Sequence, residues 1–163
     1  MDTREKILSR AGLHEVLEEH RRSGRKIVFA HGVFDLLHPG HIRYLSAARV
    51  EGDLLVVAVY SDAAVRKLKG QGRPILTERA RALLVAALSS VDYVLVLDEP
   101  DAMPLVREFQ PDVHARGAGT DSLQPPPDGE LAAHGVRAAV LASDSTHSTS
   151  ALIARVRGSM DGH

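Results

Sequence analysis

The residues best suited to chemistry in this chain are two histidines three positions apart, His38 and His41. They follow an apolar run over residues 26–30, and Pro39 lies between them where a helical pattern begins. Proline suits the first position of a helix, because its missing N–H costs nothing there and its φ is already helical. His38 then lies at or near the cap, and His41 lies one turn on, facing the same way. Free N–H groups and the positive end of the dipole at a helix N-terminus attract phosphate, so the pattern predicts phosphate chemistry with two imidazole donors.

Two other interpretations of this pair stay open. Histidines at this spacing are often solvated surface residues, and the chain contains nine histidines. A zinc site is the second, although helical zinc pairs more often use i, i+4 spacing with a glutamate between the ligands. The order of an apolar strand, Gly32, a short loop and Pro39 at a helix start favours the phosphate interpretation.

Two further segments carry groups that suit phosphate. The basic loop over residues 67–73 contains two glycines, and such a loop can close over phosphates and withdraw water, or it can be a solvated turn. Residues 143–150 are rich in Ser and Thr and precede an apolar helical pattern. Hydroxyls there are most often a helix cap, but a helix N-terminus lined by hydroxyls also suits a triphosphate.

The elements that must position these groups alternate along the chain. Apolar segments near 27–30, 54–60, 93–97, 112–115 and 136–142 are continuous enough to be strands covered on both faces. Helical patterns occupy 41–50, 62–68, 78–88, 102–109, 129–134 and 149–157, and the irregular stretch 117–128 is predicted to be a surface loop. This alternation predicts an α/β fold, a doubly wound five-stranded parallel sheet whose ligands bind at the carboxyl ends of the strands.

The domain organisation is expected to be simple. An N-terminal amphipathic helix, running from about Thr3 to Arg22, occupies residues 1–24, and a single globular domain occupies residues 25–159. A chain of 163 residues suits one domain with its own core.

Composition excludes several classes of function. The formal net charge of −1 argues against a general binder of nucleic acid or of anionic membranes, so any anion site must focus charge locally. There is no cysteine, which excludes disulfides, thiolate catalysis and cysteine metal sites. Neither a signal-like segment nor an apolar run of the ~20 residues that span a membrane is present, so the expected location is the cytoplasm.

The segment from Gly32 to His41 resembles the HxGH signature of the nucleotidyltransferase (cytidylyltransferase-like) superfamily. The likeness extends from about residue 26 to residue 156. Residues 52–62, 66–70, 73–74 and 91–94 are similar to the adenylyltransferases that activate heptose 1-phosphate for ADP-heptose synthesis. The resemblance implies a Rossmann-like nucleotidyltransferase that joins AMP from ATP to a sugar 1-phosphate and releases pyrophosphate by in-line attack, without a covalent intermediate.

The resemblance also implies roles for individual residues, with Mg²⁺ accompanying ATP, no metal ligand from the protein, and a homodimer. The implied sets are catalytic His38, His41 and Lys69; nucleotide-binding Gly32, Val33, Phe34, Gly40, Arg81, Arg116, Ser148 and Thr149; and substrate-binding Asp35, Lys67 and Arg73. Gly32 is expected to leave room for the nucleotide beside the backbone of Val33 and Phe34. Asp35 is also a candidate for orienting a loop or a histidine, and Arg79 is a rival for the role of Arg81.

Some positions depart from the pattern of the heptose enzymes. They usually read Thr-Asn-Gly where this chain has Ala30-His31-Gly32, and Val-Lys-Gly-Gly-Asp-Tyr where it has residues 115–120, with Arg116 in place of the lysine and Gly119 in place of the acid. The Arg-Thr-x-Gly of cytidylyltransferases is absent at 143–146, which favours ATP over CTP. Two alternatives remain beside the leading one: a cytidylyltransferase for glycerol 3-phosphate or a similar small alcohol phosphate, and a non-catalytic nucleotide-binding module.

Overall fold

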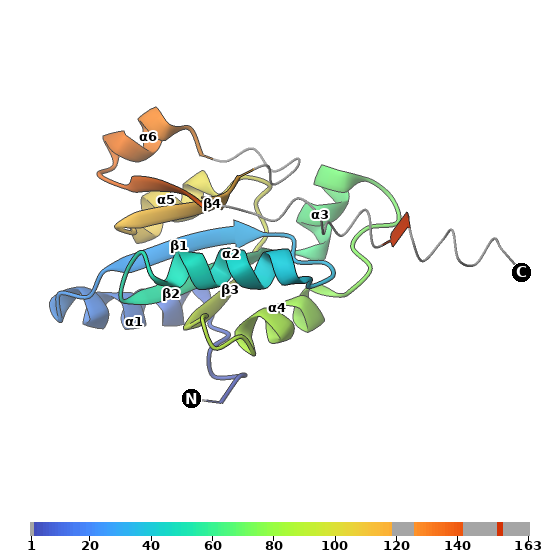
Figure 1. Ribbon diagram of the computed structural model, residues 1–163, viewed down its shortest axis with the longest axis horizontal. Helices are drawn as coiled ribbons and strands as arrows, with labels where there is room; N and C mark the ends of the chain where they lie inside the picture. The colour runs from blue at the N-terminus through green and yellow to red at the C-terminus, as the bar shows by residue number, and fades with distance from the viewer. Residues whose placement is uncertain (1, 119–125, 142–152, 155–163) are drawn as a thin grey trace, which may run out of the picture.

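The computed structural model describes residues 2–118, 126–141 and 153–154, and its centre is a parallel sheet (Figure 1). Five strands pair in the order β3-β2-β1-β4-β5. Their bounds are β1 Ile27–Gly32, β2 Leu54–Tyr60, β3 Tyr93–Leu97, β4 Val113–Gly117 and β5 Arg137–Leu141. The order reverses between β1 and β4, which is the switch point where ligands bind in such sheets. The predicted doubly wound α/β fold is confirmed.

Helices cover both faces of the sheet. The helices are α1 Arg10–Arg22, α2 Pro39–Arg49, α3 Asp62–Lys69, α4 Glu78–Ala86, α5 Met103–Phe109 and α6 Asp128–Ala133. One core cluster joins α2 and α4 to the front of the sheet in Figure 1, and a second joins α1, α3 and α5 to the other face. All seven residues of β2 are buried, as expected for a central parallel strand. No helix in the described part of the chain is both long and apolar enough to cross a bilayer.

Aspartates tie down the amino ends of the strands. The backbone N–H of Lys26 donates to Asp53 Oδ2, that of Ile27 to Asp112 Oδ2, and that of Leu55 to Asp92 Oδ2, each at 2.7 Å. Each carboxylate thereby satisfies a backbone donor where a strand begins. These contacts close the amino edge of the sheet, while the α2 and α3 helices begin beyond its carboxyl edge.

Element boundaries differ from the prediction at a few informative places. The first helix begins at Arg10 and not near Thr3, because the Ser9 side chain caps it and Ile7 forms a β-bridge with Val94 at the edge of β3. β1 and β4 each run two residues further than expected, which places His31 and Arg116 within strands. The predicted helix over 149–157 lies almost entirely outside the described residues.

Candidate active site at the carboxyl ends of the strands

The helix predicted to hold phosphate begins where expected. His38 is the N-cap of α2, with extended backbone angles (φ −136°, ψ 166°), and Pro39 opens the first turn. The side chain of His38 makes no capping hydrogen bond, so it does not occupy the first-turn N–H groups as a serine cap does. Gly40 is buried in this turn. The N-terminus of α2 therefore presents donors and a positive dipole end to a ligand.

The two signature histidines lie against each other at this N-terminus. Their rings stack with centroids 3.8 Å apart and planes 28° apart. The pKa of His41 is lowered to about 4, chiefly by burial and also by the neighbouring His38, while a hydrogen bond to the Leu36 backbone opposes the shift. The Nδ1 atom of His41 is buried and has no hydrogen-bond partner among the described residues. The negative charge of a phosphate here would favour the protonated imidazole, which can then donate from Nδ1.

Gly32 and Phe34 shape the loop between β1 and α2. A Cβ on Gly32 would lie 2.8 Å from Cε2 of Phe34, so the glycine makes room for this ring. Phe34 adopts φ 51°, a left-handed conformation that is strained for a non-glycine residue, and its ring contacts that of His41 at 5.2 Å between centroids. The expected reason for Gly32 needs correction: the space beside it holds the Phe34 side chain, and Val33 and Phe34 are buried core residues. A nucleotide contact from the backbone of Val33 and Phe34 stays a prediction.

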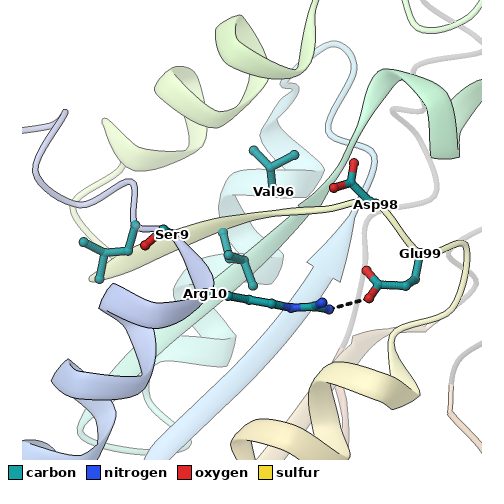
Figure 2. A pocket seen from close by; sticks show the side chains of 7 residues that line it. Ser9, Arg10, Val96, Asp98 and Glu99 are labelled. Carbon is teal, nitrogen blue, oxygen red and sulfur yellow. Dashed lines mark hydrogen bonds and ion pairs between the residues drawn. The ribbon is translucent and has the colours of Figure 1, made fainter.

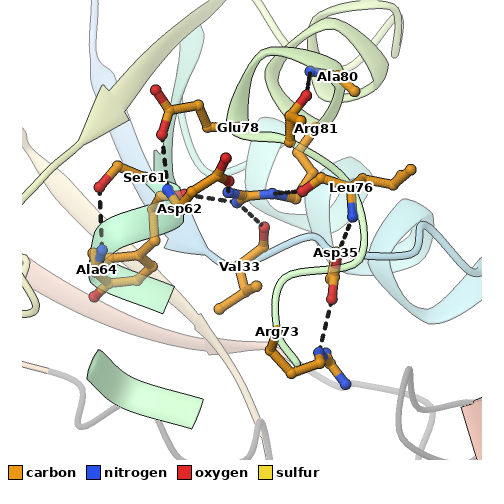
Figure 3. Close-up of polar contacts among 12 residues, drawn as sticks. Val33, Asp35, Ser61, Asp62, Ala64, Arg73, Leu76, Glu78, Ala80 and Arg81 are labelled. Atoms are coloured by element: carbon orange, nitrogen blue, oxygen red, sulfur yellow. Dashed lines mark hydrogen bonds and ion pairs between the residues drawn. The ribbon is translucent and has the colours of Figure 1, made fainter. Parts of the chain in front are cut away.

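Asp35 organises the basic loop that follows α3. Its carboxylate accepts hydrogen bonds from the N–H groups of Ile75 (2.8 Å) and Leu76 (3.0 Å) and forms an ion pair with Arg73 at 2.8 Å (Figure 3). Asp35 is 1% exposed, and the Arg73 side chain is 17% exposed. The structure thus brings these two predicted substrate residues together as partners. Their contact ties the loop to the segment that carries the histidines, as one of the two expectations for Asp35 anticipated.

Arg81 is completely buried beneath the same loop. Its guanidinium donates to the carbonyls of Leu76, Val33 and Tyr60 and forms an ion pair with Asp62 at 2.6 Å (Figure 3). The arginine thus connects the ends of β1 and β2 to the starts of α3 and α4. A phosphate contact from Arg81 stays a prediction, and it requires one of these four bonds to be released.

The remaining predicted residues lie around this centre with different exposure. Lys67 is exposed and Lys69 is partly buried, both in the last turn of α3 before Gly70, which adopts φ 83°. Arg116 lies at the end of β4 and pairs with Asp128 at 3.0 Å. Ser148 and Thr149 lie outside the described residues. Within the described ranges, no group of three or more histidine, cysteine, aspartate or glutamate side chains is placed to hold a metal ion.

A pocket of about 300 Å³ lies away from this centre, between the start of α1 and the end of β3 (Figure 2). Arg10 extends along it to Glu99, at 2.5 Å. None of the residues that line the pocket belongs to the predicted site. The Arg10 guanidinium and the Glu99 carboxylate in it are paired with each other. It does not contribute to the chemistry of the α2 N-terminus.

Sequence reasoning missed two rings beside the site, Tyr60 at the end of β2 and His114 in β4. They lie next to His31, and His114 is fully buried with neither ring nitrogen hydrogen-bonded within the described chain. The available signal was a tyrosine at the end of one predicted strand and a histidine within another. The register β1–β4, which pairs Phe29 with His114, was not predictable from local pattern.

Comparison with known proteins agrees with this geometry. The model of the cytidylyltransferase-like family matches residues 29–151, which include both histidines and the ends of all five strands. The chain belongs to the cytidylyltransferase-like family. The family predicted from the signature, and with it a nucleotidyltransferase, is confirmed.

Individual relatives of this cytidylyltransferase-like chain give the same result. It is 49% identical over 112 residues to the bifunctional protein HldE of Syntrophotalea carbinolica, covering 69% of this chain and 23% of that protein. It is 43% identical over 155 residues to HldE of Helicobacter pylori strain Shi470, covering 95% and 32%. The chain thus spans a third or less of the length of these relatives.

Solved structures agree at the level of the fold. A lipopolysaccharide core biosynthesis protein from Thermoplasma volcanium superimposes with a TM-score of 0.61 at 32% identity, covering 74% of this chain and 98% of that one. Pantothenate synthetase from Thermus thermophilus, at 17% identity and a TM-score of 0.55, covers 84% of this chain and 61% of that one and shares the fold alone.

The burial of His114 predicts a pH-dependent stability. Its pKa is lowered to about 3, chiefly by burial and also by the nearby His31 and Arg116. The unfolded chain, with a histidine pKa of about 6.5, takes up the proton first, so the free energy of unfolding falls as the pH drops from about 6.5 toward 3. His114→Leu is expected to be more stable than the wild type, by about 2 kcal/mol more at pH 5 than at pH 7.

Urea unfolding at the two pH values, followed by circular dichroism, measures this difference. The exposed His134 supplies a matched control, since His134→Leu should leave the pH dependence of the wild type unchanged. Equal pH dependence of the wild type and His114→Leu would show that His114 is not held neutral by burial.

Proposed function

We propose that this chain transfers AMP from ATP to a sugar 1-phosphate, D-glycero-β-D-manno-heptose 1-phosphate, giving an ADP-sugar and pyrophosphate. The observation that carries the proposal is the N-terminus of α2 at the switch point of the sheet, with His38 as its cap and His41 stacked on it. The resemblance to heptose 1-phosphate adenylyltransferases and the relatives named HldE supply the substrate class.

The proposed reaction needs little proton chemistry. An anionic phosphate oxygen of the sugar 1-phosphate attacks the α-phosphorus of ATP, and the bond from that phosphorus to the bridging oxygen of the β-phosphate breaks. Pyrophosphate leaves with the electron pair of that bond, so no strong base or covalent intermediate is required. Catalysis then depends on positioning and on neutralising the charge that develops on the phosphates.

The α2 N-terminus suits that task. Its N–H groups and dipole stabilise phosphate oxygens, and His38 and His41 add directional donors on the same side. Lys69 and Lys67, at the end of α3, are the proposed cations for the outer phosphates or for the sugar phosphate. Asp35, through its contacts with Arg73 and residues 75–76, holds the intervening loop in place.

Magnesium would accompany ATP and neutralise its phosphates. Two carboxylates beside the site, Asp35 and Asp62, are each paired with an arginine, at 2.8 and 2.6 Å, so they suit a structural role better than a metal cage. Mg²⁺ often keeps several waters and binds through substrate phosphates. We therefore assign the ion to the oxygens of ATP and to water.

A homodimer is part of the same proposal. Ile42 on α2 and Leu83 and Leu84 on α4 are 39–45% exposed, and both helices cover one face of the sheet. An apolar surface of this kind suits a second copy. Light scattering coupled to size exclusion should give twice the monomer mass, and Leu84→Glu should reduce it.

A pyrophosphate-release assay with Mg²⁺ tests the reaction. ATP and CTP are each crossed with heptose 1-phosphate, hexose 1-phosphates and glycerol 3-phosphate. Turnover with ATP and heptose 1-phosphate alone is the expected result. Turnover with CTP and glycerol 3-phosphate would favour the cytidylyltransferase instead, and ATP binding without any pyrophosphate release would favour the non-catalytic module.

A further inference from the structure

Three rings converge at the carboxyl side of the sheet, on the face covered by α1, α3 and α5. His31 on β1 lies between Tyr60 on β2 and His114 on β4. Nδ1 of His31 is 3.2 Å from the Tyr60 hydroxyl, and the ring centroids are 5.7 Å apart. The centroids of His31 and His114 are 5.1 Å apart. Within the cluster, His31 directly precedes Gly32 and the loop that leads to His38 and His41.

The cluster is costly as a purely structural feature. His114 is 0% exposed, and both its ring nitrogens are without a hydrogen bond within the described chain. Buried polar groups in native proteins are normally paired, and each that is not needs an explanation. An apolar residue would fill this position without that cost. Two imidazoles and a phenol on one face of three adjacent strands are therefore better explained by a ligand than by packing.

All three groups are neutral at physiological pH. Burial lowers the pKa of His31 to about 4 and is the main cause of the lowered pKa of His114, about 3, and it raises the pKa of Tyr60 well above its ordinary value. A protonated Tyr60 hydroxyl that donates to Nδ1 of His31 leaves the hydrogen of the neutral imidazole on Nε2. His31 is partly exposed whereas His114 is fully buried, so His31 is the imidazole of the cluster that a bound molecule can reach.

The charge around the cluster selects the kind of group it can bind. The exposed carboxylate of Asp101 acts on both His31 and Tyr60, raising the pKa of each. Arg116, the cation near His114, is paired with Asp128 at 3.0 Å. A neutral cluster beside a carboxylate disfavours a phosphate and suits hydroxyl groups, which can both accept from an imidazole and donate to a carboxylate. Phosphates have their own site at the α2 N-terminus.

We propose that His31 donates a hydrogen bond from Nε2 to a hydroxyl of the acceptor sugar, with Tyr60 and His114 as positioning residues, and that this contact helps select a polyhydroxylated acceptor. The proposal rests on the proposed function and adds the residue that recognises the sugar. Asp101 accepts a hydrogen bond from the Met103 backbone at 2.9 Å, which orients its carboxylate.

The test separates the acceptor from the nucleotide. His31→Phe keeps a ring but removes both nitrogens, and it should raise the KM for heptose 1-phosphate about 10-fold while the KM for ATP changes less than about 2-fold. His31→Gln keeps a donor near the position of Nε2 and should recover most of the loss. Tyr60→Phe and His114→Phe should each raise the acceptor KM about 3-fold, because they act through His31.

A second histidine–tyrosine pair supplies the matched control. His20 on α1 lies 3.1 Å from the hydroxyl of Tyr93, at the amino end of β3. His20→Phe removes the same chemistry at the opposite edge of the sheet and should leave both KM values unchanged. An acceptor KM for His31→Phe equal to that for His20→Phe, in an enzyme that turns over, would overturn the inference and leave the proposed function standing.

A binding measurement that needs no turnover distinguishes failure of the proposed subsite from failure of the proposed function. Thermal shift of the wild type by heptose 1-phosphate alone, compared with inorganic phosphate, reports the contact to the sugar. A larger shift by the sugar phosphate that is lost in His31→Phe and kept in His20→Phe supports the subsite, even if no pair of substrates releases pyrophosphate. Equal shifts by the two ligands in the wild type and in both variants would overturn it.

Discussion

His41→Ala is expected to lower kcat of the proposed transfer by about 10²- to 10³-fold, the effect typical of removing one transition-state donor. The KM for ATP should change only a few-fold, because His41 is one of several groups at the α2 N-terminus and its contribution grows as charge develops on the phosphates. Its ring is held by stacking on His38 and by the Phe34 ring, so the imidazole is positioned before the substrates bind. Steady-state kinetics with ATP and heptose 1-phosphate give both constants.

His38→Ala should have a similar effect, since His38 is the cap from which α2 begins and does not use its side chain for capping. His134→Ala, at an exposed position at the end of α6, is the control and should keep the wild-type rate. A near-wild-type kcat for either signature variant would remove that histidine from the transition state. Thermal unfolding of each variant confirms that the loss is not a loss of fold.

The sheet and its switch point were predictable because they depend on short-range pattern. Continuous apolar segments of strand length, separated by helical patterns, have few solutions other than a parallel sheet covered on both faces. Pro39 marked the start of α2 to the residue, because its effect on a helix start is local. The positions of His38 at the cap and His41 in the first turn followed from that single boundary.

The first helix shows where local pattern is insufficient. Residues 3–9 continue the helical spacing, yet Lys6 and Leu8 exchange backbone hydrogen bonds with Val94 at the edge of β3. The edge strand offers those N–H and C=O groups a partner that is far away in sequence. Ser9 then caps the helix three residues before Gly12, whose N–H donates to the serine hydroxyl.

The buried polar groups were not predictable for the same reason. A basic loop with Arg73 and an arginine in the next helix suggests solvent or phosphate, since arginine is rarely buried. Here Asp35 and Asp62 supply the opposite charges, and carbonyls at the ends of β1 and β2 supply the remaining acceptors. Only the assembled sheet brings these groups together, so the structural role of Arg81 could be seen only in the structure.

Arg81→Met is expected to lower the free energy of unfolding by about 3–5 kcal/mol, the range for breaking one side of a buried ion pair. Methionine fills a similar length but leaves the Asp62 carboxylate without its ion-pair partner and the carbonyls of Val33, Tyr60 and Leu76 without this donor. A domain of this size has a total stability of about 5–15 kcal/mol, so the variant should unfold at much lower urea. Equilibrium urea unfolding of the wild type and the variant measures the difference.

Two comparisons decide between a structural and a phosphate-binding Arg81. Arg79→Met, on the same helix but exposed, should leave stability within about 0.5 kcal/mol of the wild type. Arg81→Lys keeps the charge but cannot reproduce the planar set of donors, so it should recover only part of the stability. If Arg81→Met instead keeps the wild-type stability and raises the KM for ATP, the guanidinium exchanges its internal partners for the triphosphate. The other outcome is a loss of stability in Arg81→Met together with an unchanged KM for ATP in the partly stable Arg81→Lys. Arg81 is then a structural residue that holds α2 and the basic loop in their relative positions.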